Sequence, residues 1–217
     1  MLPVLAGILF MLASAASSLT KEAERLRSAS TVVTDFGAMK ENIPQELIEQ
    51  SKGIVIIPRL INAGLGIGGK RGRGVAMVKL DDGRWSDPVF VTLTGGSIGP
   101  QIGIQSVDLI LVFRHKSVLT RVKNGDFTIG GDASAAVGPV GRSTSANTDY
   151  KLEAEVYSYS RSRGLFAGIS INGANLSIDK DADAEYYGRD MGTRDIFETA
   201  KSNTEAVKAL KESLRNL

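Results

Sequence analysis

The 217-residue sequence contains no cysteine. This absence excludes disulfides, zinc sites built on thiolates, thiol nucleophiles and attachment to a lipid through an N-terminal cysteine. Histidine occurs once, as His115 between Arg114 and Lys116, and no G-x-S-x-G motif supplies a serine nucleophile. The sequence therefore predicts neither an enzyme nor a cofactor.

A strong excess of one charge is also lacking, since the formal net charge is +2 and the pI is about 8.8. So small an excess does not indicate a nucleic-acid partner. Only 6 prolines stand against 24 glycines, which favours tight turns and bulges over a proline-rich linker. Hydrophobic and charged contents of 42% and 23% are ordinary for a globular protein, and the length favours one domain.

The first residues form an apolar run, 2–12, followed by Ala13-Ser14-Ala15. This is the pattern of a secretory signal with cleavage after Ala15. The run is too short for a membrane-spanning helix, which needs about 20 apolar residues. No Lys or Arg precedes it, so an uncleaved anchor and a mis-assigned start stay open as alternatives. We expect residues 1–15 to be a signal peptide and residues 16–217 to be one exported domain, periplasmic or secreted, that associates with a membrane surface.

Helices are predicted at both ends of the chain. Apolar residues recur every three or four positions from Leu19 to Phe36, which predicts an amphipathic helix over 18–36. Shorter helices are expected over 44–52 and 117–124. A C-terminal amphipathic helix is expected over 193–217.

Strands are predicted between these helices. The predicted segments are 54–57, ended by Pro58; 75–80 and 85–93, joined by Asp81-Asp82-Gly83; 107–113; 156–163; and a hairpin of 169–171 with 176–178 around Asn172-Gly173. Strands flanked by terminal helices, without alternating βα units, predict an α+β fold. We expect an antiparallel β-sheet or barrel-like core with N-terminal and C-terminal amphipathic helices.

A glycine motif, Gly64-Leu65-Gly66-Ile67-Gly68-Gly69, fits the dinucleotide-binding pattern G-x-G-x-x-G. A dinucleotide site requires this turn to open a helix whose N-terminus faces the pyrophosphate. Here the chain continues as Lys70-Arg71-Gly72-Arg73-Gly74, which is too rich in glycine to start a helix. We do not predict a dinucleotide site.

Four acidic residues have the alternate spacing of a calcium loop: Asp179, Asp181, Asp183 and Glu185. Ala184 stands where that loop needs glycine, and the twelfth position is Asp190 instead of glutamate. We interpret the segment as an acidic turn after a hairpin and predict no metal site.

Lys70, Arg71 and Arg73 place three cations among glycines. Glycine allows backbone conformations in which several N–H groups converge on one anion, and the cations add charge-assisted hydrogen bonds. The segment therefore suits a phosphate group. In the alternative interpretation, the glycines serve strand crossings and bulges while the charges are simply solvated.

Several motifs in order along the chain resemble one family. They are Ser51-Lys52-Gly53-Ile54-Val55-Ile56-Ile57-Pro58, the glycine-rich stretch to Gly74, Gly83-Arg84-Trp85-Ser86-Asp87-Pro88, Gly99-Pro100-Gln101-Ile102-Gly103, Gly138-Pro139-Val140-Gly141-Arg142, 157–166 and Tyr186-Tyr187-Gly188. Each is weak alone, but together they span some 140 residues. The sequence resembles the SYLF domain family.

The resemblance implies a lipid-binding module. SYLF domains are regarded as lipid-binding modules, and eukaryotic members bind phosphoinositides through an N-terminal amphipathic helix and basic residues. Yeast members also bind actin and carry a separate peptide-binding domain. The family offers no catalytic residues to transfer. We expect docking on an anionic phospholipid membrane, with a protein partner in the cell envelope as the alternative and no nucleic acid. The expected lipid-binding residues are Lys21, Arg25, Arg27, Lys70, Arg71 and Arg73.

Overall fold

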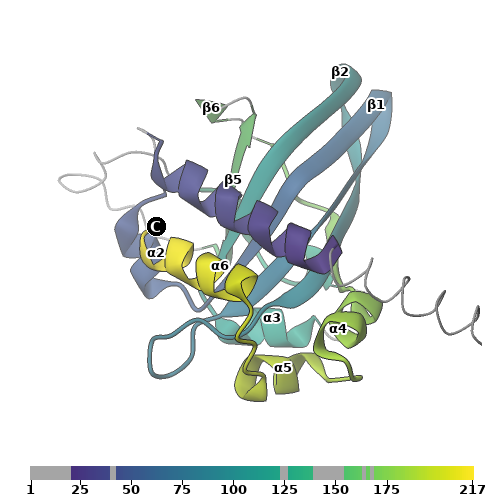
Figure 1. Cartoon of the computed structure of the whole chain (residues 1–217). Coiled ribbons are helices and arrows are strands. Elements are labelled where there is room, and N and C mark those ends of the chain that lie inside the picture. The colour runs from purple at the N-terminus through teal and green to yellow at the C-terminus, as the bar shows by residue number, and fades with distance from the viewer. Residues whose placement is uncertain (1–20, 40–42, 123–126, 139–153, 163–164, 167–168) are drawn as a thin grey trace, which may run out of the picture.

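The computed structural model describes residues 21–39, 43–122, 127–138, 154–162, 165–166 and 169–217 (Figure 1). The expected signal peptide, residues 1–15, and the motif residues 139–142 lie outside this part of the chain. The signal peptide therefore remains a prediction, and the structure does not bear on the motif residues 139–142.

Two long strands, β1 (Gly53–Val78) and β2 (Val89–Phe113), pair antiparallel over 21 residue pairs. The predicted turn joins them, because Gly83 has φ 82° and its amide donates to the Leu80 carbonyl over 2.9 Å. The prediction that Pro58 ends the first strand is wrong. A bulge between Ile57 and Leu60 accommodates the missing amide hydrogen, so β1 continues. The segment predicted over 107–113 falls on β2, whereas the one predicted over 85–93 falls on it only from Val89 onward, because β2 begins there.

The paired strands fold back on themselves near residues 65–67, where their register shifts. A Cβ built on Gly74 would lie 1.9 Å from the carbonyl oxygen of Ile56, and one built on Gly72 would lie 2.4 Å from Cγ2 of Ile57. Glycine therefore allows one half of β1 to cross the other at backbone contact. The part of the alternative interpretation that assigns these glycines to a strand crossing is confirmed.

Within the described residues, five short strands complete a seven-stranded sheet of order β3-β7-β2-β5-β4, with β1 on β2 and β6 on β5. Their bounds are β3 (Phe127–Ile129), β4 (Ala135–Val137), β5 (Val156–Ser162), β6 (Leu165–Phe166) and β7 (Ala174–Ile178). The β4–β5 pairing is parallel and the others are antiparallel, so the sheet is mixed. The fold is α+β with a barrel-like core and helices at both ends, as predicted.

The predicted hairpin around Asn172-Gly173 is wrong in its strand pairing. The turn forms, with Gly173 at φ 76° and the Ala174 amide donating to the Ile171 carbonyl over 3.0 Å. However, Ile171 is buried in the core, and β7 pairs with β3 and β2 instead of the segment before the turn.

The described helices cover residues 21–37, α2 (Gln45–Gln50), α3 (Lys116–Arg121), α4 (Lys180–Tyr187), α5 (Thr193–Thr199) and α6 (Glu205–Arg215). The single C-terminal helix predicted over 193–217 is wrong, because it is divided into α5 and α6 and Thr204 caps the second. The segment predicted as an acidic turn forms α4, since the Asp179 side chain caps its first turn by accepting from the Ala182 amide.

Side chains of β1 and β2 alternate between two hydrophobic clusters. Val55 and Leu111 belong to one, whereas Ile56 and Ile110 belong to the other. The second cluster also contains the buried faces of helix 21–37 and α6, which lie across the outside of the sheet (Figure 1). Burial on both faces explains why these strands read as continuous apolar runs.

Candidate functional site

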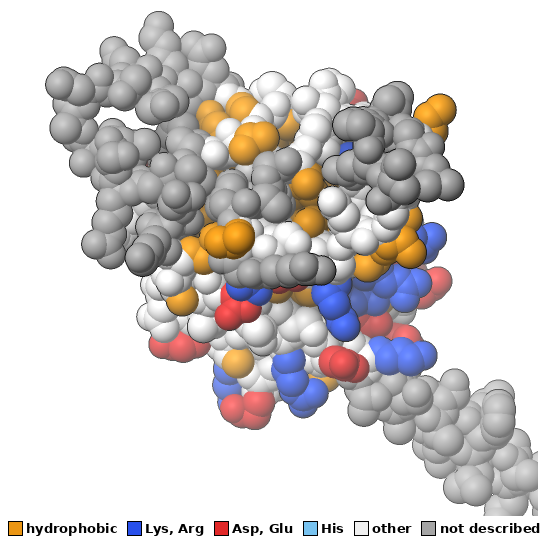
Figure 2. All heavy atoms as spheres, turned by 90° about the horizontal axis from the view of Figure 1, so that it is seen from above, with side chains coloured by type: hydrophobic (Ala, Val, Ile, Leu, Met, Phe, Trp, Pro, Cys, Tyr) orange, Lys and Arg blue, Asp and Glu red, His pale blue; other side chains and the backbone are white. Residues whose placement is uncertain are grey.

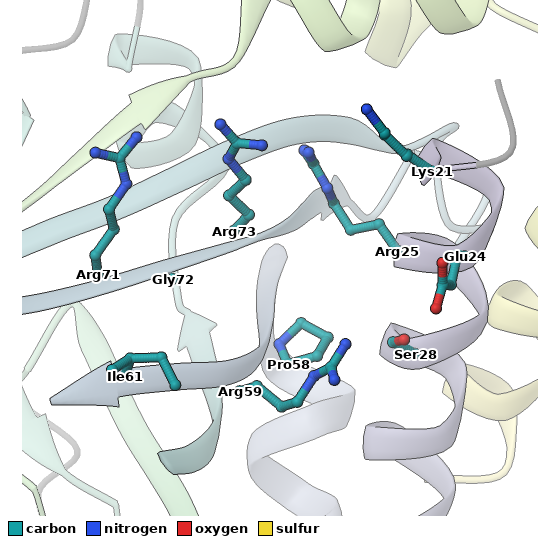
Figure 3. A pocket seen from close by; sticks show the side chains of 10 residues that line it. All are labelled: Lys21, Glu24, Arg25, Ser28, Pro58, Arg59, Ile61, Arg71, Gly72 and Arg73. Atoms are coloured by element: carbon teal, nitrogen blue, oxygen red, sulfur yellow. The ribbon is translucent and has the colours of Figure 1, made fainter. Parts of the chain in front are cut away.

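A pocket of about 590 Å³ lies between helix 21–37 and β1 (Figure 3). Five basic side chains and one carboxylate line it, so its charge is strongly positive. The lining residues are Lys21, Glu24, Arg25 and Ser28 from the helix and Pro58, Arg59, Ile61, Arg71, Gly72 and Arg73 from β1.

Regular periodicity positions most of these side chains. Lys21, Arg25 and Ser28 are spaced by four and three residues, which puts them on one face of the helix. Arg71 and Arg73 are two residues apart on a strand and therefore point to the same side, and Figure 3 shows their guanidinium groups in a row with that of Arg25. The strand crossing at Gly72 brings this row close to the β1 bulge.

Arg59 is the residue that sequence reasoning missed. It lies in the β1 bulge with φ 54°, a left-handed conformation that costs a non-glycine residue about 1–2 kcal/mol. Its amide donates to Oδ1 of Asp108 over 3.1 Å, and Oδ2 of Asp108 pairs with Arg161 at 2.9 Å. Asp108 therefore fixes the bulge that carries Arg59 to the pocket. Pro58 inside a β-branched run was the available signal, because proline within a strand marks a bulge.

Arg25 differs from the other cations of the pocket because its charge is compensated. It pairs with Glu22 and Asp179, each at 3.2 Å, and its guanidinium lies 5.2 Å from the centre of the Phe90 ring. Burial raises the pKa of the Glu22 carboxyl, and the Arg25 charge opposes that shift. Arg25 thus joins the helix to the start of α4.

The remaining cations of the pocket form no close ion pair, although the charge of Arg73 also opposes the upward shift of the Glu22 pKa. Within the described part of the chain, no carboxylate lies within 4.0 Å of the basic groups of Lys21, Arg59, Arg71 or Arg73. All four residues are exposed. Guanidinium groups in this arrangement can donate paired hydrogen bonds to a phosphate, and Lys21 adds a point charge at the rim.

Two of the six predicted lipid-binding residues do not line the pocket. Lys70 is 8% exposed, and its Nζ donates to the Ser170 carbonyl over 2.7 Å. Burial lowers the pKa of the Lys70 amine. Arg27 is exposed on another face of the helix, two positions from Arg25. The structure therefore brings together Lys21, Arg25, Arg71 and Arg73.

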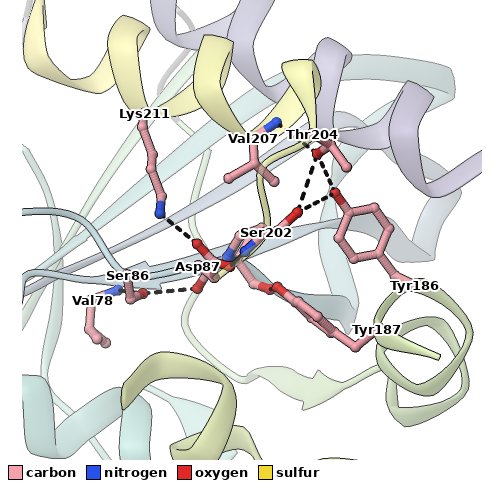
Figure 4. A network of polar contacts seen from close by, with 10 residues as sticks. Val78, Ser86, Asp87, Tyr186, Tyr187, Ser202, Thr204, Val207 and Lys211 are labelled. Atoms are coloured by element: carbon pink, nitrogen blue, oxygen red, sulfur yellow. Dashed lines mark hydrogen bonds and ion pairs between the residues drawn. The ribbon is translucent and has the colours of Figure 1, made fainter. Parts of the chain in front are cut away.

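A second polar group, which we call the Asp87 cluster, joins the β1–β2 turn to the C-terminal helices (Figure 4). Asp87 is 2% exposed, pairs with Lys211 at 2.5 Å and accepts from the Ser202 amide. Tyr187 donates to the Pro88 carbonyl over 2.6 Å, and burial raises the pKa of its hydroxyl. The Asp87 cluster thus contains motif residues that carry the family resemblance.

Asp183 is a buried carboxyl on α4, 3% exposed, and it accepts from the Phe90 amide over 2.8 Å. Burial raises its pKa to about 7, and that hydrogen bond opposes the shift. Among the described residues, no three His, Asp or Glu side chains are arranged to hold a metal ion. Every helix in the same residues is too short or too polar to traverse a bilayer.

Comparison with known proteins gives a consistent result. A family model, Ysc84, described as "Las17-binding protein actin regulator", matches residues 94–217. The human SH3 domain-containing YSC84-like protein 1 is 33% identical over 178 residues, which is 82% of this chain and 52% of the human protein. LAS seventeen-binding protein 3 of Saccharomyces cerevisiae is 30% identical over 172 residues, 78% of this chain and 37% of the yeast protein.

The chain spans about half or less of the length of these relatives. An SH3 domain-containing protein of Schizosaccharomyces pombe also matches over part of its length. It is 34% identical over 83% of this chain and 43% of its own length. The family description and the name of the yeast relative refer to binding of another protein, whereas the human and S. pombe names refer to an SH3 domain.

Proposed function

The chain belongs to the Ysc84 (SYLF) family, and from this premise we propose that its binding function is docking on membranes that contain anionic phospholipids, with the basic pocket as the headgroup site. The observation that carries this proposal is the convergence of Lys21, Arg59, Arg71 and Arg73 on one pocket without a carboxylate partner in the described chain.

A phosphate headgroup matches this pocket in charge. Each of the exposed basic residues contributes on the order of 1 kcal/mol of attraction near an anionic bilayer. The guanidinium groups add directional hydrogen bonds that favour a phosphate over a diffuse negative surface. Ser28 offers a hydroxyl to the same ligand from the helix side.

The test is co-sedimentation with vesicles of phosphatidylcholine mixed with increasing phosphatidylserine or phosphatidylinositol phosphate, at low and high salt. Binding is expected to rise with anionic lipid and to fall with salt, because exposed charges are screened within about 8 Å at physiological ionic strength. Absence of binding to every composition would overturn the proposal.

The double variant Arg71→Glu/Arg73→Glu is expected to weaken binding at least about 100-fold, since two attractions become repulsions. Its matched control is Arg194→Glu/Lys201→Glu, which changes the net charge equally at exposed positions in and beside α5. Equal loss of binding in both variants would show that net charge, and not the pocket, governs association.

A second candidate function is docking of an acidic protein segment in the same pocket. The description of the family and the name of the yeast relative favour it, because both refer to binding of Las17. Salt-sensitive binding to an acidic peptide, without binding to any vesicle, would establish this candidate in place of the membrane.

A further inference from the structure

The folded-back end of the β1–β2 pair carries no charge. We call this end the tip and define it as residues 61–69 of β1 and 95–106 of β2. Neither range contains Asp, Glu, Lys, Arg or His. The charges that flank the tip in sequence are Arg59 and Lys70 on β1 and Asp108 on β2.

Large hydrophobic side chains are exposed on this tip. Ile67 is 80% exposed, Ile104 is 78% exposed and Ile61 is 41% exposed. Ile104 is the Cα partner of Ala63, two residues from Ile61, so Ile61 and Ile104 share one face of the paired strands. Exposed isoleucines on an uncharged surface indicate contact with an apolar medium.

The tip adjoins the basic pocket. Ile61 lines the pocket beside Arg59, while Arg71 and Arg73 follow Ile67 on the returning half of β1. Figure 2, seen from above the tip, shows hydrophobic and basic side chains next to each other on one face. An apolar projection bordered by cations matches the profile of a lipid interface, where acyl chains lie beneath phosphate groups.

On the basis of the proposed function, we infer that the tip inserts into the acyl region of the bilayer while the pocket holds a headgroup. The occupant of the tip is a lipid surface and not a second copy of the chain, because a row of cations beside the isoleucines would repel its own copy and attract anionic lipid. Insertion is shallow, since none of the described strands β3 to β7 pairs with the tip, and backbone groups at a strand edge must stay near water.

The natural absence of cysteine permits a direct test with single labels. An environment-sensitive fluorophore is attached to Ile67→Cys at the tip and, as the control, to Asp81→Cys in the exposed turn at the other end of the β1–β2 pair. With anionic vesicles, the label at position 67 is expected to shift to shorter wavelength and to be quenched by lipids carrying a spin label in the acyl chain. The label at position 81 is expected to change in neither respect.

A second measurement uses Ile67→Ser/Ile104→Ser, which removes apolar surface without adding charge. Vesicle binding at high salt is expected to fall about tenfold or more, because the salt-resistant part of the affinity comes from apolar burial. The salt-sensitive part at low ionic strength, set by the arginines, is expected to persist.

The outcomes separate this inference from the proposed function. Vesicle binding without a shift at position 67, or with equal shifts at positions 67 and 81, would overturn the tip as the inserted element and leave headgroup binding in place. A shift that depends on protein concentration in the absence of vesicles would assign the tip to a second copy. Failure of the unaltered chain to sediment with any vesicle would overturn the proposed function and the inference together.

Discussion

The Asp87 cluster and the basic pocket use charged side chains in opposite ways. At the Asp87 cluster, the buried Asp87 carboxylate pairs with the Lys211 ammonium group and accepts from the Ser202 amide. The neighbouring Tyr187 hydroxyl donates to a backbone carbonyl. At the pocket, four exposed cations lie together without a carboxylate partner in the described residues. Paired and buried charge holds elements together, whereas unpaired and exposed charge of one sign is available to a ligand.

Arg25 lies between these two classes. It lines the pocket, yet Glu22 and Asp179 already compensate its charge, and Phe90 covers its guanidinium. Its main role is to join helix 21–37 to α4. The predictions below test whether buried charged groups act on stability and exposed cations act on vesicle binding.

The largest effect on stability is expected for Asp87→Ala. The change leaves the Lys211 ammonium and the Ser202 amide without their acceptor, and breaking a buried pair in this way costs about 3–5 kcal/mol. Urea denaturation measures the free energy of unfolding. Asp81→Ala, at an exposed position in the turn, is the control and is expected to leave that free energy unchanged. Vesicle binding by the folded fraction of Asp87→Ala should stay intact; its loss would link the cluster to the pocket.

A smaller effect on the free energy of unfolding, dependent on pH, is expected for Asp183→Asn. The unfolded carboxyl releases its proton near pH 3.8 and the folded one near pH 7. The folded chain therefore holds the extra proton in this range, so stability falls as pH rises from about 4 to about 7. Asparagine keeps an acceptor for the Phe90 amide and removes this loss, which is about 2–4 kcal/mol.

Urea denaturation of wild type and Asp183→Asn at several pH values between 4 and 8 measures the difference. Burial also raises the pKa of Glu22, so the variant should retain a weaker slope of the same sign. Asp190→Asn, at an exposed position beyond α4, is the control and should follow the wild-type curve. Parallel curves for wild type and Asp183→Asn would contradict the prediction.

The smallest effect is expected for Lys70→Met in vesicle binding. The Lys70 amine lies against the Ser170 carbonyl and away from the pocket, so its removal should change the affinity less than about twofold, compared with the larger loss for Arg71 and Arg73. Co-sedimentation of the folded variant measures this. A loss comparable to that of an arginine variant would move Lys70 into the site.

Periodicity explains why part of the site was predictable. The helix spacing groups Lys21 with Arg25 and separates Arg27 from both. Likewise, the two-residue period of a strand separates Lys70 from Arg71 and Arg73. Because the glycine-rich stretch was interpreted as an anion-binding loop and not as the middle of a strand, all three cations were assigned to one ligand. A prediction of one uninterrupted strand through this stretch would have separated Lys70 from the two arginines.

Arg59 could not be grouped with the others by spacing alone. It is twelve positions before Arg71, and only the crossing at Gly72 and the bulge held by Asp108 bring the two together. The pairing of β7 and the division between α5 and α6 also depend on contacts between distant segments, namely β3 with β7 and Asp87 with Ser202. Local patterns do not contain such contacts. The apolar runs, by contrast, predicted the α+β core because both faces of β1 and β2 are buried.

The long β1–β2 pair has a consequence for how the chain folds. Its 21 residue pairs begin at Ala76 with Val89, 13 residues apart, and end at Gly53 with Phe113, 60 residues apart. Once the Asp-Gly turn closes, each new pair adds only a small loop-closure entropy to the one already formed. Folding is therefore expected to start at the turn of residues 80–83, with β1–β2 residue pairs then forming one after another toward the tip. The β1–β2 part of the sheet then forms from segments close in sequence, before the C-terminal helices pack against it.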